Sequence, residues 1–190
     1  MNKIDYEAII KPFLSQKRYD HSLCVRDAAV RLAKKYEANV EKAEVAGILH
    51  DIMKDVPPDE QLKMMMRYDI ILTDVERSAQ KLWHAMLGEA YLEKELKITD
   101  AEILNAVRYH TTGRAHMTLL DKIVFIADFI SADRDYDGVE ALRRVADVSL
   151  EQAMIEGMVY TIQDLTKGCR AIHPDTIAAY NEAVLKNKYN

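Results

Sequence analysis

Apolar residues recur every three or four positions along most of this chain, and such spacing is typical of amphipathic helices. No stretch shows the sustained apolar–polar alternation that marks a half-buried strand. Only 6 glycines and 4 prolines occur among 190 residues, so few positions force a turn. The sequence therefore predicts an all-α fold, a helical bundle whose length suits one domain over residues 1–190.

Local sequence features indicate where several of these helices begin. Asp74 can cap a helix, and Pro174 suits a first helical turn. Thr99 with Glu102 matches the T-x-x-E pattern of a capping box. A break is expected near Lys81. The expected helices span about 6–16, 20–36, 39–51, 59–68, 74–96, 99–110, 118–130, 139–145, 149–167 and 174–185.

The overall charge and the cysteines narrow the class of protein. The formal net charge of −5 gives no general attraction to nucleic acid or to an anionic membrane. The start of the chain lacks the apolar core of a signal peptide, and no run approaches the ~20 apolar residues of a membrane span. Cys24 and Cys169 form no CxxC motif and are expected to be reduced packing residues. We expect a cytoplasmic protein with neither nucleic acid nor membrane as a partner.

Four of the 6 histidines fall in one ordered series with two aspartates, and each lies in or beside an expected helix. Neutral imidazoles and carboxylates are the side chains that hold first-row divalent ions. The series is His21, His50, Asp51, His84, His110 and Asp128.

Asp128 is the member of this series that an ordinary structural role explains least. It lies inside the run IVFIADFI, which is too apolar to face water, and an ionised carboxylate there needs a partner. The pair His50-Asp51 taken alone is explained as an exposed helix end. His84 suits a core position, and His110 suits a helix C-terminus, where the helix dipole favours imidazolium. Together the six residues predict a metal centre.

Six segments of the chain are also similar to a known family. They resemble the HD-domain metal-dependent phosphohydrolases, an all-helical family named after its His-Asp doublet, and more narrowly its bacterial symmetrical bis(5'-nucleosyl)-tetraphosphatases (YqeK-like). The resemblance extends from about Tyr6 to Val184. His116 departs from the small residue expected in this family, and is either an extra pocket group or a neutral change. The six segments are YDHSLCV, ILHDIMKD, WHAMLGEAYL, RYHTTGR, KIVFIADFI and AIHPDTIAAYN.

The resemblance implies an HD-domain helical bundle with a metal-binding core at about 18–132 and C-terminal helices at about 139–187 that complete a nucleotide pocket. His84 and His110 hold a second ion or touch substrate phosphates, so one or two ions remain open. The mixed donor set suits iron, with manganese or another transition ion as alternatives, and zinc is less favoured because no thiolate is present. The implied ligands of the first ion are His21, His50, Asp51 and Asp128.

The same resemblance implies which residues act on the substrate. Asp51 is placed to orient or deprotonate a water molecule, and Lys54 lies one helical turn further on. Either His84 or His110 is expected to protonate or stabilise the leaving phosphate. The expected catalytic residues are Asp51, Lys54, His84 and His110. The expected substrate-binding residues are Arg18, His21, Lys54, His84, His110, Thr111, Thr112, Arg134, Arg170, Ala171, Ile172, His173 and Tyr180.

The leading functional hypothesis is a metal-dependent hydrolase that cuts diadenosine tetraphosphate symmetrically into two ADP. One alternative is an HD-domain phosphohydrolase of other nucleotides, and another is a metal-dependent nucleotide sensor without turnover. A helical scaffold with incidental histidines is the least specific alternative. Apolar positions such as Met154, Met158 and Ile162 suit either the core or the surface of a homodimer.

Overall fold

Short polar side chains determine where many of the helices begin. Asn39 accepts a hydrogen bond from the amide of Lys42, and Ser149 accepts one from the amide of Gln152. The structure is a computed structural model that describes residues 4–188. Every regular element within that range is helical, which confirms the all-α prediction: α1 (Tyr6–Ile10), α2 (Gln16–Lys35), α3 (Val40–Leu49), α4 (Pro58–Arg67), α5 (Asp74–Ser78), η1 (Gln80–Leu82), α6 (Trp83–Lys94), α7 (Ala101–Tyr109), α8 (Leu119–Ile130), α9 (Val139–Ala146), α10 (Leu150–Lys167) and α11 (Pro174–Lys188).

Several predicted helix boundaries are wrong: α2 begins at Gln16 rather than near residue 20, and Thr73 rather than Asp74 caps α5. Two further boundaries are fixed by competing contacts. The first helix does not continue to residue 16, since Ser15 is extended and its amide donates to Asp55 Oδ2 at 2.8 Å. Thr99 forms no capping box, because Asp100 caps α7 and accepts from the amides of Glu102 and Ile103. The expected break near Lys81 is confirmed by the short helix η1.

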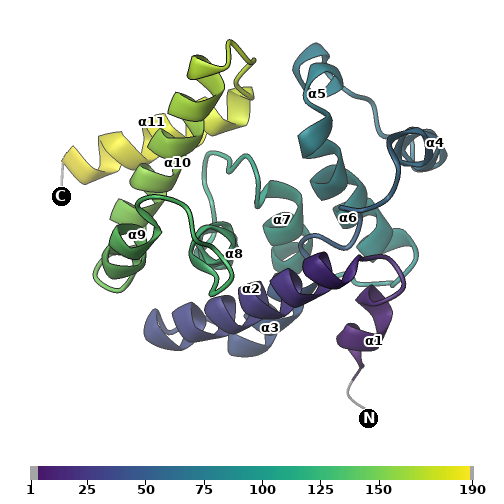
Figure 1. Ribbon diagram of the computed structural model, residues 1–190, viewed down its shortest axis with the longest axis horizontal. Helices are drawn as coiled ribbons and strands as arrows, with labels where there is room; N and C mark the ends of the chain where they lie inside the picture. Colours follow the sequence, from purple (N-terminus) through teal and green to yellow (C-terminus); the bar gives the residue numbers. More distant parts are fainter. Residues whose placement is uncertain (1–3, 189–190) are drawn as a thin grey trace.

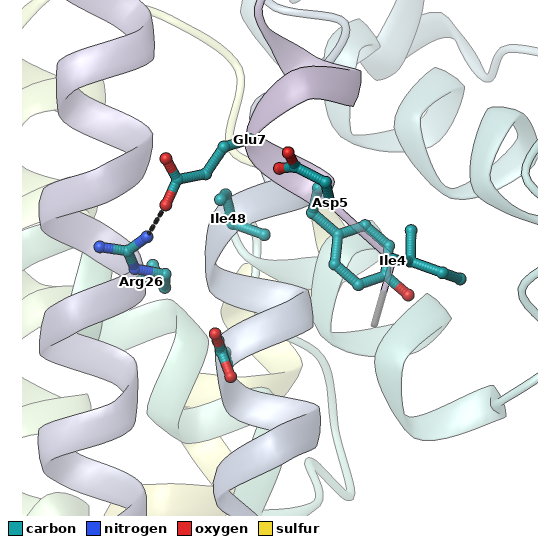
Figure 2. A pocket seen from close by; sticks show the side chains of 7 residues that line it. Ile4, Asp5, Glu7, Arg26 and Ile48 are labelled. Atoms are coloured by element: carbon teal, nitrogen blue, oxygen red, sulfur yellow. Dashed lines mark hydrogen bonds and ion pairs between the residues drawn. The ribbon is translucent and has the colours of Figure 1, made fainter. Parts of the chain in front are cut away.

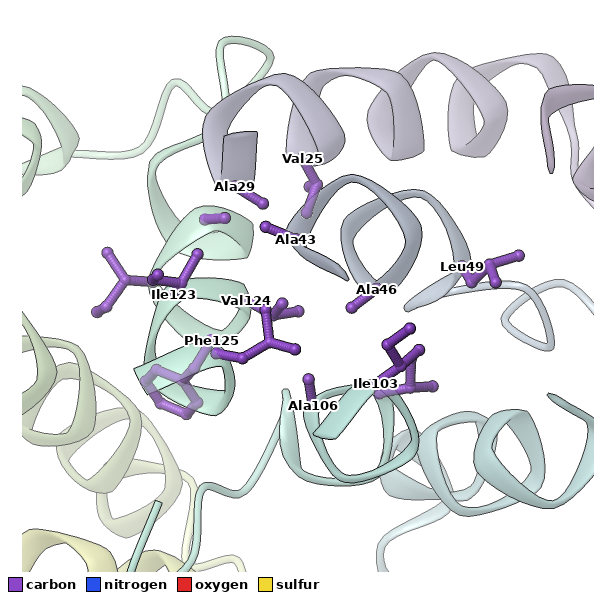
Figure 3. Packing of buried hydrophobic residues seen from close by; sticks show 14 of the residues in the cluster. Val25, Ala29, Ala43, Ala46, Leu49, Ile103, Ala106, Ile123, Val124 and Phe125 are labelled. Atoms are coloured by element: carbon purple, nitrogen blue, oxygen red, sulfur yellow. The ribbon is translucent and has the colours of Figure 1, made fainter. Parts of the chain in front are cut away.

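The core lies between four helices that pack side by side. α2 packs along α3 and α8, and α7 lies against α3 and α8. Small side chains such as Ala29, Ala43 and Ala46 let these helices approach closely (Figure 3). Gly47 is required at the tightest point, because a Cβ there would lie 2.9 Å from the Cα of Arg26.

The remaining helices flank this core on two sides. α9, α10 and α11 lie beside α8, whereas α4, α5 and α6 lie on the opposite side of α7 (Figure 1). On α10, Met154 and Met158 are each 1% exposed, so they belong to the core rather than to a surface for a second copy. Within residues 4–188, we find no helix that is both long and apolar enough to cross a membrane.

The first helix packs against the C-terminal half of α3 and the middle of α2. Glu7 pairs with Arg26 there, and α1 contacts α3 (Figure 2). A hollow of about 260 Å³ lies beside this contact. Its lining includes Ile48 but none of the six residues in the histidine–aspartate series, so it is separate from the site described next.

Candidate metal centre

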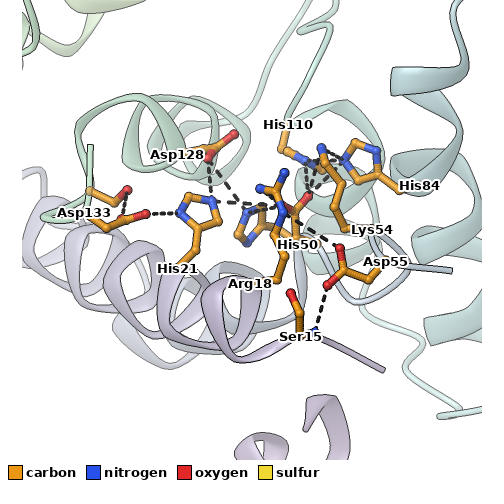
Figure 4. A network of polar contacts seen from close by, with 12 residues as sticks. Ser15, Arg18, His21, His50, Lys54, Asp55, His84, His110, Asp128 and Asp133 are labelled. Atoms are coloured by element: carbon orange, nitrogen blue, oxygen red, sulfur yellow. Dashed lines mark hydrogen bonds and ion pairs between the residues drawn. The ribbon is translucent and has the colours of Figure 1, made fainter. Parts of the chain in front are cut away.

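The six residues of the series converge at one place from five segments of the chain (Figure 4). α2 supplies the first histidine, the end of α3 the doublet, α6 and the end of α7 the next two histidines, and α8 the last aspartate. Five of the six are buried and Asp128 is partly buried. The predicted convergence is therefore present, and the side chains that form it are His21, His50, Asp51, His84, His110 and Asp128.

Two of the histidines are held by the ends of their own helices. His50 and His110 directly follow α3 and α7, where the last carbonyl groups of a helix lack partners. The Nδ1 atom of His50 lies 2.8 Å from the carbonyl oxygen of Gly47, and that of His110 lies 2.7 Å from the carbonyl oxygen of Val107. Since a carbonyl only accepts, each Nδ1 donates, and each Nε2 keeps a lone pair that faces the centre.

His21 is oriented by a carboxylate that the sequence did not single out. Its Nδ1 lies 2.7 Å from Asp133 Oδ2, and the other carboxylate oxygen of Asp133 accepts from Ser131. Its Nε2 lies 3.0 Å from Asp128 Oδ1 and 4.0 Å from Asp51 Oδ2. A carboxylate behind a metal-binding imidazole is a common way to fix the ring and its tautomer.

The donor atoms form overlapping groups around Asp51. His50 Nε2 lies 3.7 Å from Asp51 Oδ2 and 3.9 Å from Asp128 Oδ1. On the other side, Asp51 Oδ1 lies 2.9 Å from His84 Nε2 and 3.5 Å from His110 Nε2. The two sides correspond to the sets expected for a first and a second ion, with Asp51 shared between them.

The buried polar atoms of this site suit a cation. Among the described residues, His50 Nε2 and Asp51 Oδ1 are buried without a hydrogen-bond partner. His84 Nε2 lies near Asp51 Oδ1, but its ring is not aligned for a hydrogen bond. Leaving such acceptors unpaired costs about 1–3 kcal/mol each. A divalent cation would satisfy both, so the residues fit a metal ion.

The protonation states also suit a cation. Burial lowers the pKa of His50 and of His84 to about 4, so both rings are neutral at pH 7. Burial raises the pKa of Asp51, but the surrounding imidazoles of His50, His84 and His110 outweigh it and hold that pKa well below its usual range. The centre therefore presents neutral rings around an ionised carboxylate, which is the state that metal binding requires.

His21 is the exception, and it predicts a pH dependence. Burial lowers its pKa, but the hydrogen bond and the charge of Asp128 raise it more, so the net pKa lies above the usual value. Below that pKa an ion has to displace a proton from His21. We expect metal affinity to fall about tenfold per pH unit there and proton release on binding near neutral pH. Calorimetric titrations in buffers of different ionisation enthalpy measure this release; an affinity that does not change from pH 8 to pH 6 would contradict it.

Three of the positively charged side chains that were expected to bind substrate lie at the metal centre. Arg18 Nη1 is 3.5 Å from Asp51 Oδ2, and Lys54 Nζ is 3.2 Å from His84 Nε2. Arg134 donates to the side chain and the backbone carbonyl of Asp128. Together with the hydrogen bond from His21, Arg134 keeps the pKa of Asp128 far below its usual range, although burial raises it. Positive charge is thus gathered where a phosphate would approach the centre.

A cavity of about 510 Å³ adjoins the His110 end of the centre, and we call it the Thr111 cavity. It lies between the 78–82 segment and the ends of α10 and α11, which face each other in Figure 1. Of the residues expected to bind substrate, those that line it are Thr111, Thr112, Arg170, Ala171 and His173.

The remaining residues named from the sequence either lie outside the Thr111 cavity or have a partner of their own. Ile172 and Tyr180 are not among the residues lining the Thr111 cavity; Tyr180 packs against the hydrophobic core instead. Arg170 pairs with Asp164 on α10 while lining the cavity. His116, the departure from the family pattern, pairs with Glu182 on α11. It lies outside both the metal centre and the Thr111 cavity, so it is not an extra pocket group there.

His173 forms part of the wall of the Thr111 cavity rather than part of the metal centre. Its Nδ1 accepts from the amide of Asp175, so its Nε2 carries the proton and lies 3.5 Å from the carboxylate of Glu76. Glu76 in turn accepts from Thr73 and Arg108. The buried Glu76 carboxylate thus connects α5, α7 and the segment before α11. The sequence did not indicate this role, because Thr73 and Glu76 form an ordinary T-x-x-E capping box.

Comparison with known proteins agrees with this geometry. Residues 18–133 match the HD domain family. Relatives named symmetrical bis(5'-nucleosyl)-tetraphosphatase include one from Halalkalibacterium halodurans, 39% identical over 99% of this chain and 100% of the relative, and one from Bacillus subtilis, 36% identical over 95% and 97%. A crystal structure of a protein from Clostridium acetobutylicum, described as a predicted HD superfamily hydrolase involved in NAD metabolism, superposes with a TM-score of 0.92. It is 36% identical in sequence and covers 97% of this chain and 100% of its own.

Proposed function

Because the chain belongs to the HD domain family, and within it to the symmetrical bis(5'-nucleosyl)-tetraphosphatases, we propose that it hydrolyses diadenosine tetraphosphate at the middle of its phosphate chain to give two ADP. The observation that carries this proposal is the convergence of six donor side chains beside a cavity of nucleotide size. The match of the relatives over nearly the full chain supports the choice of substrate.

The proposed ligands follow from the donor distances. We assign His21, His50, Asp51 and Asp128 to a first ion, and Asp51, His84 and His110 to a second. Iron is the proposed metal because the resemblance to the HD-domain phosphohydrolases implies it; the mixed set of imidazoles and carboxylates suits iron or manganese, which is the alternative. A divalent ion bound here supplies a Lewis acid for a phosphoryl oxygen and lowers the pKa of water.

The roles of the chain's own residues follow from charge and protonation. Asp51 is ionised and central, and its proposed role is to orient or deprotonate the attacking water. Lys54 and Arg18 flank Asp51 and offset the negative charge that grows on the phosphate oxygens. His84 is neutral, so it is better suited to hold an ion or the substrate than to give up a proton. The charge on Arg134 keeps Asp128 ionised.

The nucleotide is proposed to bind in the Thr111 cavity. Thr111 Oγ1 is buried and has no hydrogen-bond partner in the described part of the chain, so it is free to bind the ligand. In this arrangement a metal-binding part at about 18–132 supplies the chemistry. The helices at about 139–187 then complete the pocket through the segment from Arg170 to His173.

Product identification tests the proposed function. Protein purified without oxygen and loaded with Fe(II) or Mn(II) should convert diadenosine tetraphosphate to ADP alone, as resolved by anion-exchange chromatography. ATP with AMP as products would contradict symmetric cleavage. Turnover of mononucleotides or cyclic dinucleotides but not of this compound would favour another HD phosphohydrolase. Binding of ADP without any turnover would favour a sensor.

The environment of the cysteines supports the proposed cytoplasmic location. Cys24 and Cys169 are both free thiols; Cys169 is exposed, so its prediction as a packing residue is wrong. Exposed free thiols persist in a reducing compartment.

Asp133→Asn is expected to weaken metal binding by about 10–100-fold, since the amide still contacts His21 but no longer carries the charge that raises the basicity of the ring. Activity should therefore return at high metal concentration. Activity measured against metal concentration tests this, with Asp135→Asn as a matched control two residues away. Loss that persists at saturating metal would show that Asp133 has a different role.

A further inference from the structure

A second cavity adjoins the His84 end of the centre. It has a volume of about 520 Å³, and we call it the Pro57 cavity. The turn 55–58 before α4 and the start of α4 line one part, and Gln80 and Lys81 line another. Lys54 and His84, which belong to the centre, also line it.

The two cavities adjoin each other next to the centre. Their volumes are about 510 and 520 Å³, and both are lined by Gln80 and Lys81, which therefore stand between them. His84 lines the Pro57 cavity, and the residues directly after His110 line the Thr111 cavity. Since His84 Nε2 and His110 Nε2 are 3.2 Å apart, a chain of phosphates passing from one cavity to the other crosses the metal centre.

A buried polar atom in the Pro57 cavity points to a ligand. Gln61 lines this cavity and is only 5% exposed. Its Nε2 donates to the carbonyl oxygens of Met53 and Val56, and these bonds fix the orientation of the amide. Its Oε1 is buried and has no partner within the described residues. This acceptor needs a hydrogen-bond donor, which a nucleobase amino group or a ribose hydroxyl supplies.

The charges suit a nucleotide that enters with its phosphates towards the centre. Lys54 and Lys81 are cations in the lining, and Lys54 lies 3.6 Å from Asp51 Oδ1. Asp55 also lines the cavity, but it is engaged by Arg18 and by the amide of Ser15. Val56, Pro57 and Pro58 give an apolar surface against which a base can lie.

We propose that the Pro57 cavity binds the second nucleoside diphosphate half of the substrate, while the Thr111 cavity binds the first. The inference rests on the proposed function. Two neighbouring cavities of similar volume, one beside His84 and the other beside the segment after His110, match a substrate with two equal halves that is cut at its middle. Gln61 becomes a specificity-determining residue for the second nucleoside, and Lys81 contacts the phosphate chain where it passes between the cavities.

Filling the Pro57 cavity tests the proposal. Val56→Phe places a ring in the cavity from a half-buried turn position. We expect the KM for diadenosine tetraphosphate to rise about tenfold or more, equivalent to about 1.4 kcal/mol of binding, while kcat changes much less. Val148→Phe is the matched control, because Val148 is 84% exposed in the turn before α10. A KM for Val56→Phe equal to that of the control would overturn the proposal.

Binding of ADP to the metal-loaded protein gives a readout that needs no turnover. Calorimetry should find two ADP per wild-type chain, one for Val56→Phe, one for Ala171→Phe in the Thr111 cavity, and none for the double variant. The wild-type count does not depend on how any variant folds, and a single ADP per wild-type chain would refute the second subsite. Two bound ADP without hydrolysis of diadenosine tetraphosphate would instead refute the proposed function while the subsite stands. Normal hydrolysis with one ADP bound would refute only the subsite.

Discussion

Asp51→Asn should reduce kcat for the proposed hydrolysis by about 10³-fold, the range expected when a general base is removed from its site. Within residues 4–188, Asp51 belongs to two of the three donor groups, as do His50 and His110, and its two oxygens face opposite sides of the centre. Asparagine keeps the shape but loses the charge, one metal-binding oxygen and the ability to accept a proton. Steady-state kinetics with metal analysis of the same sample measures both losses.

The matched control for this variant is Asp59→Asn, an exposed aspartate in the first turn of α4. It should retain wild-type kcat and metal content. If Asp51→Asn keeps more than about a tenth of the wild-type kcat, the role given to this carboxylate is wrong. A variant that binds metal and ADP normally but does not turn over would locate its role in proton transfer rather than in holding the ion.

Gly47→Ala is expected to be the most destabilising single methyl addition in the core, lowering the free energy of unfolding by about 1–3 kcal/mol. The added Cβ would lie 2.9 Å from the Cα of Arg26 and 3.1 Å from the Cβ of Ala29, so α2 and α3 have to separate. The carbonyl of Gly47 also orients His50, and a shift of α3 should weaken metal binding as well. Urea denaturation of the metal-free protein isolates the packing effect.

Gly157→Ala is the matched control for this second prediction. Its added Cβ would lie 3.4 Å from Phe125 Cε1, an ordinary contact, and alanine is favoured over glycine in a helix by about 1 kcal/mol. We expect no loss of stability there. Equal urea midpoints for Gly47→Ala and the wild type would show that the two helices can separate without cost.

The sequence predicted the six residues of the centre as a set rather than one by one. Asp128 inside an apolar run had no ordinary structural explanation, whereas the doublet, His84 and His110 each had one, and the resemblance joined them into one series. Helix type was predicted equally well, since apolar spacing repeats over many residues. The ends of the helices were predicted less accurately. Asp100 caps α7 instead of Thr99, one residue away, and both residue types are good helix caps.

The residues that the sequence did not reveal act through distant partners. Asp133 orients His21 from 112 positions away, and nothing in the loop around it distinguishes its carboxylate from those of its neighbours. Gln61 looks like an ordinary polar residue on the surface of an amphipathic helix, until the structure shows it buried against the turn 53–56. Such roles depend on tertiary contacts, which local patterns do not encode.

The hydrogen bonds that hold the rings of His50 and His110 have a consequence for how the protein acquires its ion. Each ring is held by a backbone carbonyl three residues earlier in the chain, so these two metal-binding groups are oriented in the folded protein before a cation binds. A preformed cage of imidazoles and carboxylates follows the usual affinity ranking of divalent metals and does not by itself exclude the stronger competitors. The ion recovered with the protein should therefore vary with the growth medium, and samples of the same chain should differ in specific activity until they are stripped and reloaded.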